Sequence, residues 1–288
     1  MRFSFWPAAG NPWNELVETC RHAEATGWDG IWFADHFMPN AADTSAPVAE
    51  VMTTLAGLAA CVPRVRLGSL VVGNTYRSPA VLAKMAANVD IISGGRLILG
   101  LGAGWQENEH DAYGIPFYTI GGRLRRLEEA VQIVKSLVAN DNTTFEGRYY
   151  QIVDAPLAPK PVQRPLPLLI GGGGEQVTMR IAAQYADEWN VWGAPERLRQ
   201  KIGVLEGHCA DLGRDPHSIK RSAQALVFMS DDPAVTERAS AMPMPAIAGN
   251  VDQLREIMAA YQEAGVDEFI VPDRTFGAGE QARATMDR

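Results

Sequence analysis

The chain has few of the features that mark secreted or membrane proteins. It holds only 3 cysteines among 288 residues, and Cys20, Cys61 and Cys209 stand far apart with no CxxC pair. We therefore expect buried thiols in a reducing compartment. Residues 1–7 lack the basic and apolar regions of a signal peptide. No apolar run reaches the roughly 20 residues of a membrane helix, so the sequence predicts a soluble, cytoplasmic protein with no membrane partner.

Positive charge is also scarce. The chain carries 26 Lys and Arg against 34 Asp and Glu, a formal net charge of −8. Proteins that bind nucleic acid use clustered Lys and Arg to neutralise the phosphate backbone. The composition therefore predicts no nucleic-acid partner.

The motifs of several enzyme classes are missing. There is no GxSxG and no SxxK motif, which disfavours a serine hydrolase. A catalytic zinc site needs three protein ligands, yet the sequence has no HxH and no HExxH. Glu107, Glu109 and His110 are close in sequence, but their helical context predicts a solvated face. Three more histidines, His22, His208 and His217, fall on or near expected helices. We therefore predict no metal site.

Short apolar runs alternate with longer segments of helical periodicity along most of the chain. In one such segment Leu82, Met85, Val89 and Ile92 recur at helical spacing. Strands are expected at 1–7, 31–34, 65–72, 97–99, 168–170, 189–192, within 221–229 and at 268–272. Eight strands, each followed by a helix, predict an α/β protein with a single (β/α)8 TIM barrel over residues 1–288. An open doubly wound sheet is the alternative.

Two stretches interrupt this rhythm. Residues 143–152 predict a hairpin that turns near Glu146 and Gly147, and five prolines within 156–167 predict an extended connector. Together they form an insertion at about 140–167. The second stretch, at about 230–250, is rich in Met, Pro and Asp, and we expect it to be a mobile loop near the active site.

The active site of such a barrel lies where the strands end. Asp35 and His36 follow the second strand, and His is the commonest proton-transfer group near neutral pH. Gly73 and Asn74 follow the third strand and would let a planar ring or a phosphate approach the backbone. Trp192 offers an aromatic surface after the sixth strand.

Two glycine-rich segments also follow strands. Residues 100–105 read Gly-Leu-Gly-Ala-Gly-Trp, which is not a full dinucleotide-binding fingerprint. We expect Gly102 and Gly104 to thin the rim so that a flat cofactor can lie against it. Residues 171–174 are four glycines that precede an expected helix at 175–186, an arrangement that predicts a phosphate cradle.

Taken together, these motifs resemble the bacterial luciferase-like flavin and deazaflavin oxidoreductases, and within them the branch that uses coenzyme F420. The matching segments are Asp35-His36, Arg66-Leu67-Gly68, Ser78-Pro79-Ala80, residues 93–96, residues 99–105 and residues 171–174. The resemblance implies a (β/α)8 barrel with insertions. It also implies hydride transfer between C5 of F420, or N5 of FMN, and a small-molecule substrate stacked above the ring.

The resemblance assigns roles to individual residues. Asp35 and His36 would contact the deazaflavin and assist proton movement. Leu70 and Val71 would form a bulged strand whose non-prolyl cis peptide backs the ring. The amides of Gly172, Gly173 and Gly174 would hold the cofactor phosphate. Arg77 and Lys84 would either screen a polyanionic cofactor tail or lie on a solvated helix face.

One residue departs from the family pattern. The sugar-phosphate dehydrogenases of this family have a glutamate where this chain has Trp105. We therefore expect an apolar or conjugated substrate that stacks between the ring and Trp105, with His36 as the remaining proton-transfer group. The leading hypothesis is an F420-dependent oxidoreductase. The alternatives are an FMN-dependent monooxygenase supplied by a separate reductase, and a cofactor-binding protein without turnover. The resemblance also implies a homodimer.

Overall fold

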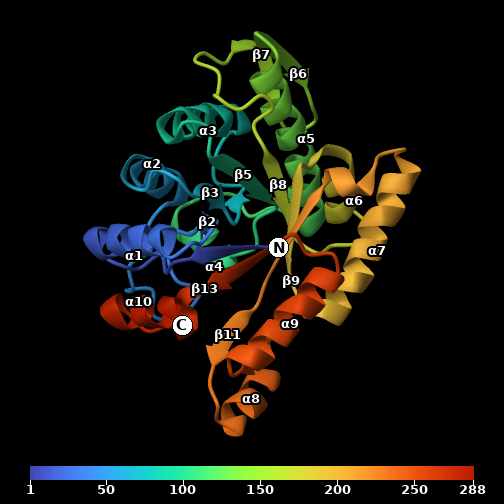
Figure 1. The fold of residues 1–288 in the computed structure, drawn as a ribbon. Helices are drawn as coiled ribbons and strands as arrows, with labels where there is room; N and C mark the ends of the chain where they lie inside the picture. The colour runs from blue at the N-terminus through green and yellow to red at the C-terminus, as the bar shows by residue number, and fades with distance from the viewer. The chain divides into compact units, whose positions relative to one another are not determined.

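The computed structural model describes all residues from Met1 to Arg288, and it divides into two compact units. The first unit comprises Met1–Ala8, Asn14–Trp32 and Gly172–Arg288, and the second comprises Ala9–Trp13 and Phe33–Gly171. Figure 1 shows the order of the elements along the chain. No helix is both long enough and apolar enough to span a membrane.

The first unit is built on five parallel strands. Their order is β2 (Gly30–Phe33), β1 (Arg2–Trp6), β13 (Glu268–Pro272), β10 (Lys220–Gln224) and β9 (Glu188–Trp192). Its helices are α1 (Trp13–Ala25), α6 (Thr178–Tyr185), α7 (Pro195–Asp211), α9 (Val251–Glu263) and α10 (Gly279–Asp287), with short 3-10 turns η1 (Pro216–Ser218) and η2 (Asp273–Thr275). The completely buried Phe5, Trp32 and Phe269 belong to its core. Asn250 and Gln253 form a capping box that fixes the start of α9.

The second unit contains three further parallel strands, β3 (Arg66–Ser69), β5 (Leu97–Gly102) and β8 (Leu168–Gly171). The two-residue strand β4 (Val72–Gly73) also pairs with β5. The helices are α2 (Val51–Cys61), α3 (Pro79–Ser93), α4 (Glu107–Ala112) and α5 (Ile120–Ala139). Proline at the first position of α3 and a left-handed Gly94 at its end set the limits of that helix.

The eight parallel strands are those that the sequence pattern predicts, and each is followed by at least one helix. The predicted third strand is divided into β3 and β4 around Leu70 and Val71. The predicted hairpin is present as β6 (Asn142–Glu146) and β7 (Gln151–Pro156), which pair antiparallel and lie beside α5 in Figure 1. The helix expected from residue 175 begins later, at Thr178, after a turn.

Residues 230–250, which the sequence predicts to be a mobile loop, contain regular secondary structure. This stretch contains α8 (Pro233–Ser240) and β12 (Ala246–Gly249), and β12 pairs in parallel with β11 (Leu226–Met229). Asp232 caps α8 by accepting a hydrogen bond from the Ala234 amide at 2.9 Å. Only one residue of α8 is buried, so the helix has no apolar stripe by which a sequence pattern could identify it.

Candidate functional site

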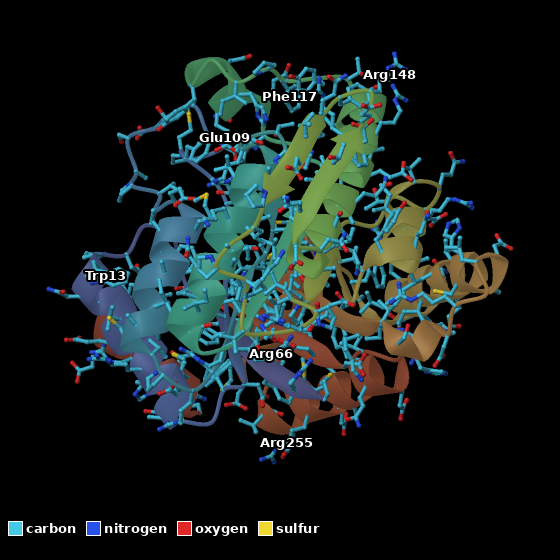
Figure 2. The ribbon with its side chains drawn as sticks, turned by 90° about the horizontal axis from the view of Figure 1, so that it is seen from above. Trp13, Arg66, Glu109, Phe117, Arg148 and Arg255 are labelled. Atoms are coloured by element: carbon cyan, nitrogen blue, oxygen red, sulfur yellow. The ribbon has the colours of Figure 1, made fainter.

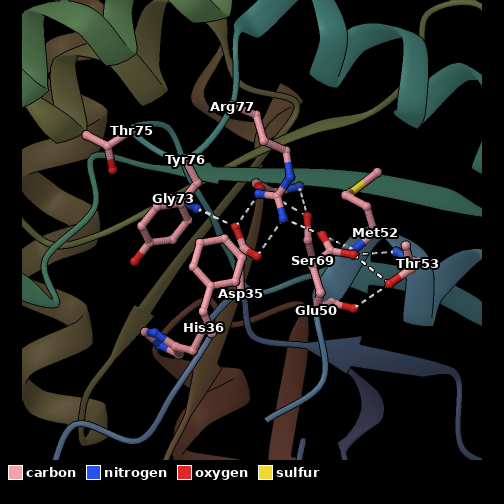
Figure 3. A network of polar contacts seen from close by, with 12 residues as sticks. Asp35, His36, Glu50, Met52, Thr53, Ser69, Gly73, Thr75, Tyr76 and Arg77 are labelled. Atoms are coloured by element: carbon pink, nitrogen blue, oxygen red, sulfur yellow. Dashed lines mark hydrogen bonds and ion pairs between the residues drawn. The ribbon is translucent and has the colours of Figure 1, made fainter. Parts of the chain in front are cut away.

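The carboxylate of Asp35, in the loop after β2, is buried and holds two segments of the second unit together. It accepts hydrogen bonds from Arg77 Nη1 at 2.7 Å, from Arg77 Nη2 at 3.0 Å and from the Gly73 amide at 3.1 Å (Figure 3). Burial raises the pKa of Asp35, although Arg77 and the Gly73 amide oppose that rise. Asp35 therefore fixes the backbone at the end of β4.

Arg77 forms ion pairs with two acids in this network. It also contacts the carboxylate of Glu50, which caps α2 by accepting from the amides of Met52 at 2.9 Å and Thr53 at 2.7 Å (Figure 3). The side chain is mostly buried between two acids, so neither role expected for Arg77, tail screening or a solvated helix face, describes it. Lys84 donates to the carbonyl of Ala158.

His36, the next residue, is held by a buried glutamate. Its Nδ1 lies 2.9 Å from Glu109 Oε1, while Glu109 Oε2 accepts from the Phe37 amide at 2.8 Å. The Tyr76 hydroxyl also donates to Glu109. Burial raises the pKa of Glu109, but these hydrogen bonds outweigh it and place the pKa below the ordinary value. Because a carboxylate only accepts, Nδ1 carries a proton and Nε2 is left for other partners.

Helix α4, which supplies Glu109, and the residue before it form further hydrogen bonds with the loop after β2. Gln106 donates to the carbonyl of Met38 at 2.9 Å, and Asn108 donates to the carbonyl of Pro39 at 3.0 Å. Figure 2 marks Glu109 among the side chains of this region. The short helix therefore positions the backbone on both sides of Phe37 and stabilises the orientation of His36.

The sequence predicts that Glu107, Glu109 and His110 lie on a solvated face. This prediction is wrong for Glu109 and His110. Glu107 is exposed, but Glu109 and His110 are completely buried. His110 Nδ1 lies 2.6 Å from the Gln106 carbonyl, and Nε2 lies 2.7 Å from Thr75 Oγ1. The six-residue helix turns these side chains inward because their hydrogen-bond partners lie in neighbouring loops.

The glycines of β5 make room for a protein side chain. A Cβ on Gly100 would lie 2.0 Å from the Ser69 carbonyl, and one on Gly102 would lie 2.7 Å from Val71 Cγ2. A Cβ on Gly171 would lie 2.8 Å from Val71 Cγ1. The peptide bond between Leu70 and Val71 is cis, as the resemblance implies. The space that we expected a flat cofactor to use is thus filled by Val71, and contact of Gly102 with a cofactor stays a prediction.

Gly104 and Asn74 also lie beside β5. Gly104 has a positive φ of 81°, and a Cβ there would lie 2.7 Å from Thr75 Oγ1, so the backbone itself requires glycine. Asn74 is 2 % exposed and donates from Nδ2 to Tyr150 Oη at 3.3 Å. Its Oδ1 is buried and has no donor within the chain, which is the arrangement expected where a ligand supplies the missing hydrogen bond.

Trp105 presents a free aromatic surface. Its side chain is 60 % exposed, and its ring meets the His36 ring edge to face with centroids 5.4 Å apart. An aromatic ring with an exposed face can stack against a flat ligand.

In the first unit, the glycines after β8 form a loop whose amides are only partly used. The Gly172 amide donates to the Asn190 carbonyl at 2.9 Å, whereas Gly173 and Gly174 have no such partner for their amides. Sequence reasoning missed Lys201 on α7, whose Nζ donates to the Gly173 carbonyl at 2.8 Å. Its charge is shared with Glu175 at 2.7 Å. This loop combines free N–H groups with an ammonium group, which suits an anion.

Two other features belong to the first unit. Trp192, at the end of β9, lies 5.9 Å from Trp6 between ring centroids. Asp273, directly after β13, accepts from the Ala8 amide at 2.6 Å. Burial raises the pKa of Asp273 to about 6, against the lowering effect of that hydrogen bond. A raised pKa of this kind is common in acids that carry protons at functional sites.

A cavity of about 550 Å³ lies elsewhere in the first unit, between α9, α10, β11 and β13. It is lined mainly by apolar side chains, and none of the predicted site residues borders it. No group of three or more His, Cys, Asp or Glu could hold a metal ion.

Comparison with known proteins identifies the family. The sequence model described as luciferase-like monooxygenase matches residues 1–264. An F420-dependent glucose-6-phosphate dehydrogenase of Kineococcus radiotolerans is 40 % identical over 225 residues, which are 76 % of this chain and 65 % of that relative. An FMNH(2)-dependent dimethylsulfone monooxygenase of Pseudomonas putida is 32 % identical over 155 residues, 54 % of this chain and 42 % of that relative. The chain thus spans less than two thirds of the length of either.

Among solved structures, an F420-dependent secondary alcohol dehydrogenase in complex with an F420-acetone adduct superposes with a TM-score of 0.86 at 20 % identity. The match covers 99 % of this chain and 96 % of that one. This likeness confirms the predicted α/β fold of the (β/α)8 TIM-barrel class. Because the family model matches most of the sequence, the chain belongs to the luciferase-like monooxygenase family.

Proposed function

We propose that this chain is an oxidoreductase that uses coenzyme F420 to transfer a hydride to or from a small organic substrate. The observation that carries the proposal is the hydrogen bond from His36 Nδ1 to the buried Glu109, because it leaves Nε2 available for proton transfer. The relatives named above include enzymes described as F420-dependent. A cofactor-binding protein without turnover would not need a histidine fixed in this way.

Two sets of residues, each within its own unit, support the proposal. In the second unit, the unpaired Oδ1 of Asn74 would accept from a ring N–H, and Leu70, Val71, Gly73, Gly102 and Gly104 are proposed to lie near the ring. In the first unit, the free amides of Gly173 and Gly174 and the ammonium group of Lys201 would receive a phosphate. Gly172 would contribute through its backbone conformation, since its amide already has a partner. Trp192 is proposed to contact the cofactor through its ring.

The bound deazaflavin would supply the carbon that gives or receives the hydride. His36 would accept at Nε2 the proton that a substrate hydroxyl loses on oxidation, and would return it in the reverse direction. Glu109 holds the ring through Nδ1, which leaves Nε2 as the nitrogen for that transfer. Asp35 would act through Arg77 and the Gly73 amide, because its oxygens already have these donors.

We propose an apolar or conjugated substrate that stacks on Trp105, and the exposed ring beside His36 supports this. The test is turnover of F420 by the purified chain, followed by cofactor absorbance, with a panel of secondary alcohols, conjugated carbonyl compounds and glucose 6-phosphate. We expect turnover with members of the first two groups, and an increase in KM in Trp105→Ala with no change in F420 affinity. Turnover of glucose 6-phosphate alone would refute the substrate proposal and leave the cofactor proposal standing.

The second candidate is an FMN-dependent monooxygenase that receives reduced flavin from a separate reductase. The similarity to the FMNH(2)-dependent enzyme of Pseudomonas putida favours it. The same protein incubated with chemically reduced FMN, oxygen and members of the same substrate panel would then release an oxygenated substrate and water, whereas the F420 proposal predicts no oxygenated product.

A homodimer in the cytoplasm is also proposed. Val81 and Ile92 on α3 are 55 % and 49 % exposed, and their spacing of eleven residues places them on one face of the helix. An apolar helix face of this kind supports self-association. Light scattering after size-exclusion chromatography should give a dimer for the wild type and a monomer for Val81→Asp/Ile92→Asp; a monomeric wild type would contradict the proposal.

A further inference from the structure

Three arginines of the second unit have no carboxylate partner. Arg125 and Arg126 lie in the first half of α5, and Arg148 lies in the turn of the β6–β7 hairpin. None of them forms an ion pair with an acid, although the chain carries a net charge of −8. The arginine–tyrosine cluster, as we call it, consists of Arg125, Arg126, Arg148, Tyr118, Tyr149 and Tyr150.

The tyrosine rings hold the guanidinium groups by their faces. Arg126 Cζ lies 3.6 Å from the ring centroid of Tyr118 and 4.6 Å from that of Tyr149. Arg148 Cζ lies 5.4 Å from the Tyr149 centroid. Stacking engages the face of a guanidinium group and leaves its in-plane N–H donors for other partners. Arg126 Nε is buried without an acceptor.

A network of hydrogen bonds keeps the cluster in place. The carboxylate of Glu129 accepts from the amides of Arg148 and Tyr149 at 2.9 Å each and from the Tyr150 amide at 3.0 Å. Arg125 Nε donates to Tyr149 Oη at 2.9 Å. This hydrogen bond, with the charges of the neighbouring arginines, holds the pKa of Tyr149 below its ordinary value.

The cluster adjoins the candidate site of the second unit. Tyr150 Oη accepts from Asn74, whose Oδ1 has no donor. Arg123, one turn before Arg126, donates from Nε to the Gly104 carbonyl at 3.1 Å and lies over the ring of Phe117. Figure 2 shows Phe117 and Arg148 on the same side of the view as Glu109.

We propose that the arginine–tyrosine cluster is a binding site for oxyanions, either carboxylate or phosphate groups. Planar guanidinium groups with free in-plane donors bind such groups in a bidentate manner. Glu129, the acid beside the cluster, is engaged by three backbone amides and not by a guanidinium group. The oxyanion has two potential sources: the acidic tail of the cofactor, or an acidic group on the substrate. The anion site does not rest on the proposed function, whereas the assignment of its source does.

Calorimetric titration of the full chain with inorganic pyrophosphate tests the site. Wild type should bind pyrophosphate with an affinity that falls as salt rises. Arg126→Gln and the more exposed Arg148→Gln should each weaken binding at least tenfold. The control is Arg255→Gln on α9, an arginine that is 76 % exposed and lies outside the second unit. Equal binding by wild type and both cluster variants, or no binding by wild type, would overturn the proposal.

A second titration separates the two sources. If the cofactor tail occupies the cluster, Arg148→Gln should weaken F420 at least tenfold and leave the affinity for a deazaflavin without the tail unchanged. If a substrate acid occupies it, Arg148→Gln should bind both deazaflavins as the wild type does and raise KM for acidic substrates only. Either result supports the oxyanion site. If neither cofactor binds wild type but pyrophosphate binding still depends on Arg126, the proposed function fails and the site stands.

Discussion

Replacing Glu109 with glutamine tests whether the buried carboxylate organises the site. The wild-type side chain accepts from three donors: His36 Nδ1, the Phe37 amide and the Tyr76 hydroxyl. Glutamine has the same shape but only one acceptor oxygen. The amide –NH₂ group of glutamine would therefore face either the Phe37 amide, or His36 Nδ1 and the Tyr76 hydroxyl. A donor that faces another donor forms no hydrogen bond with it.

The magnitude follows from this count. A hydrogen bond to a charged group contributes about 1.5–3 kcal/mol, and a buried donor left unpaired costs a further amount of similar size. We therefore expect Glu109→Gln to lower the free energy of unfolding by about 2–4 kcal/mol. Glu107→Gln, two residues away on the exposed side of α4, is the matched control and should change it by less than about 0.5 kcal/mol.

Urea denaturation at several pH values provides the assay. Because the pKa of Glu109 is lowered on folding, its stabilising effect is complete above the unfolded-state pKa and is lost as the pH falls through the folded-state pKa. The difference between wild type and Glu109→Gln should thus be largest at neutral pH and shrink below about pH 4.5. A Glu109→Gln variant as stable as Glu107→Gln at pH 7 would refute the reasoning.

Three further predictions concern other parts of the molecule. His36→Ala should lower kcat about 10²–10⁴-fold with little change in cofactor affinity; unchanged turnover would remove His36 from the mechanism. Asp273→Asn should raise the free energy of unfolding at pH 7, by up to about 3 kcal/mol. Burial raises the pKa of Asp273 to about 6, so wild type loses stability as pH rises from about 4 to 6; equal pH profiles in urea would contradict this. Gly102→Ala should be destabilised by about 1–3 kcal/mol and rescued in part by Val71→Ala, whereas Gly203→Ala, with nothing near its Cβ, should not be destabilised. If the effects of Gly102→Ala and Val71→Ala were additive in a double-mutant cycle, Val71 would not fill the space at Gly102.

The sequence predicts the fold well because the fold depends on repeated local patterns. Strands β2, β5, β8 and β13 are short apolar runs, and helices α3 and α7 begin at a proline, Pro79 and Pro195. Helix α8 escaped prediction because it lies on the surface with one buried residue. Local periodicity carries no information about a helix that has no apolar face.

The candidate site was only partly predictable. Asp35 and His36 were found from their place at a strand end, but Glu109 contacts His36 across 73 positions of sequence, and no local pattern indicates that a glutamate on a short acidic helix turns inward. The glycines of β5 can be recognised from the sequence, but the atoms that exclude a Cβ there, the Ser69 carbonyl at Gly100 and Val71 at Gly102, cannot. Lys201 lies on a helix far along the chain from the glycine loop that it contacts. Such contacts depend on tertiary structure.

The central claim is that the chain uses a deazaflavin. Fluorescence titration of the purified protein with F420 and with FMN, at the same ionic strength, tests it most directly. The account predicts micromolar binding of F420 with much weaker binding of FMN, and loss of F420 affinity in Lys201→Met but not in the control Arg255→Gln. Tight binding of FMN with no binding of F420 would contradict it.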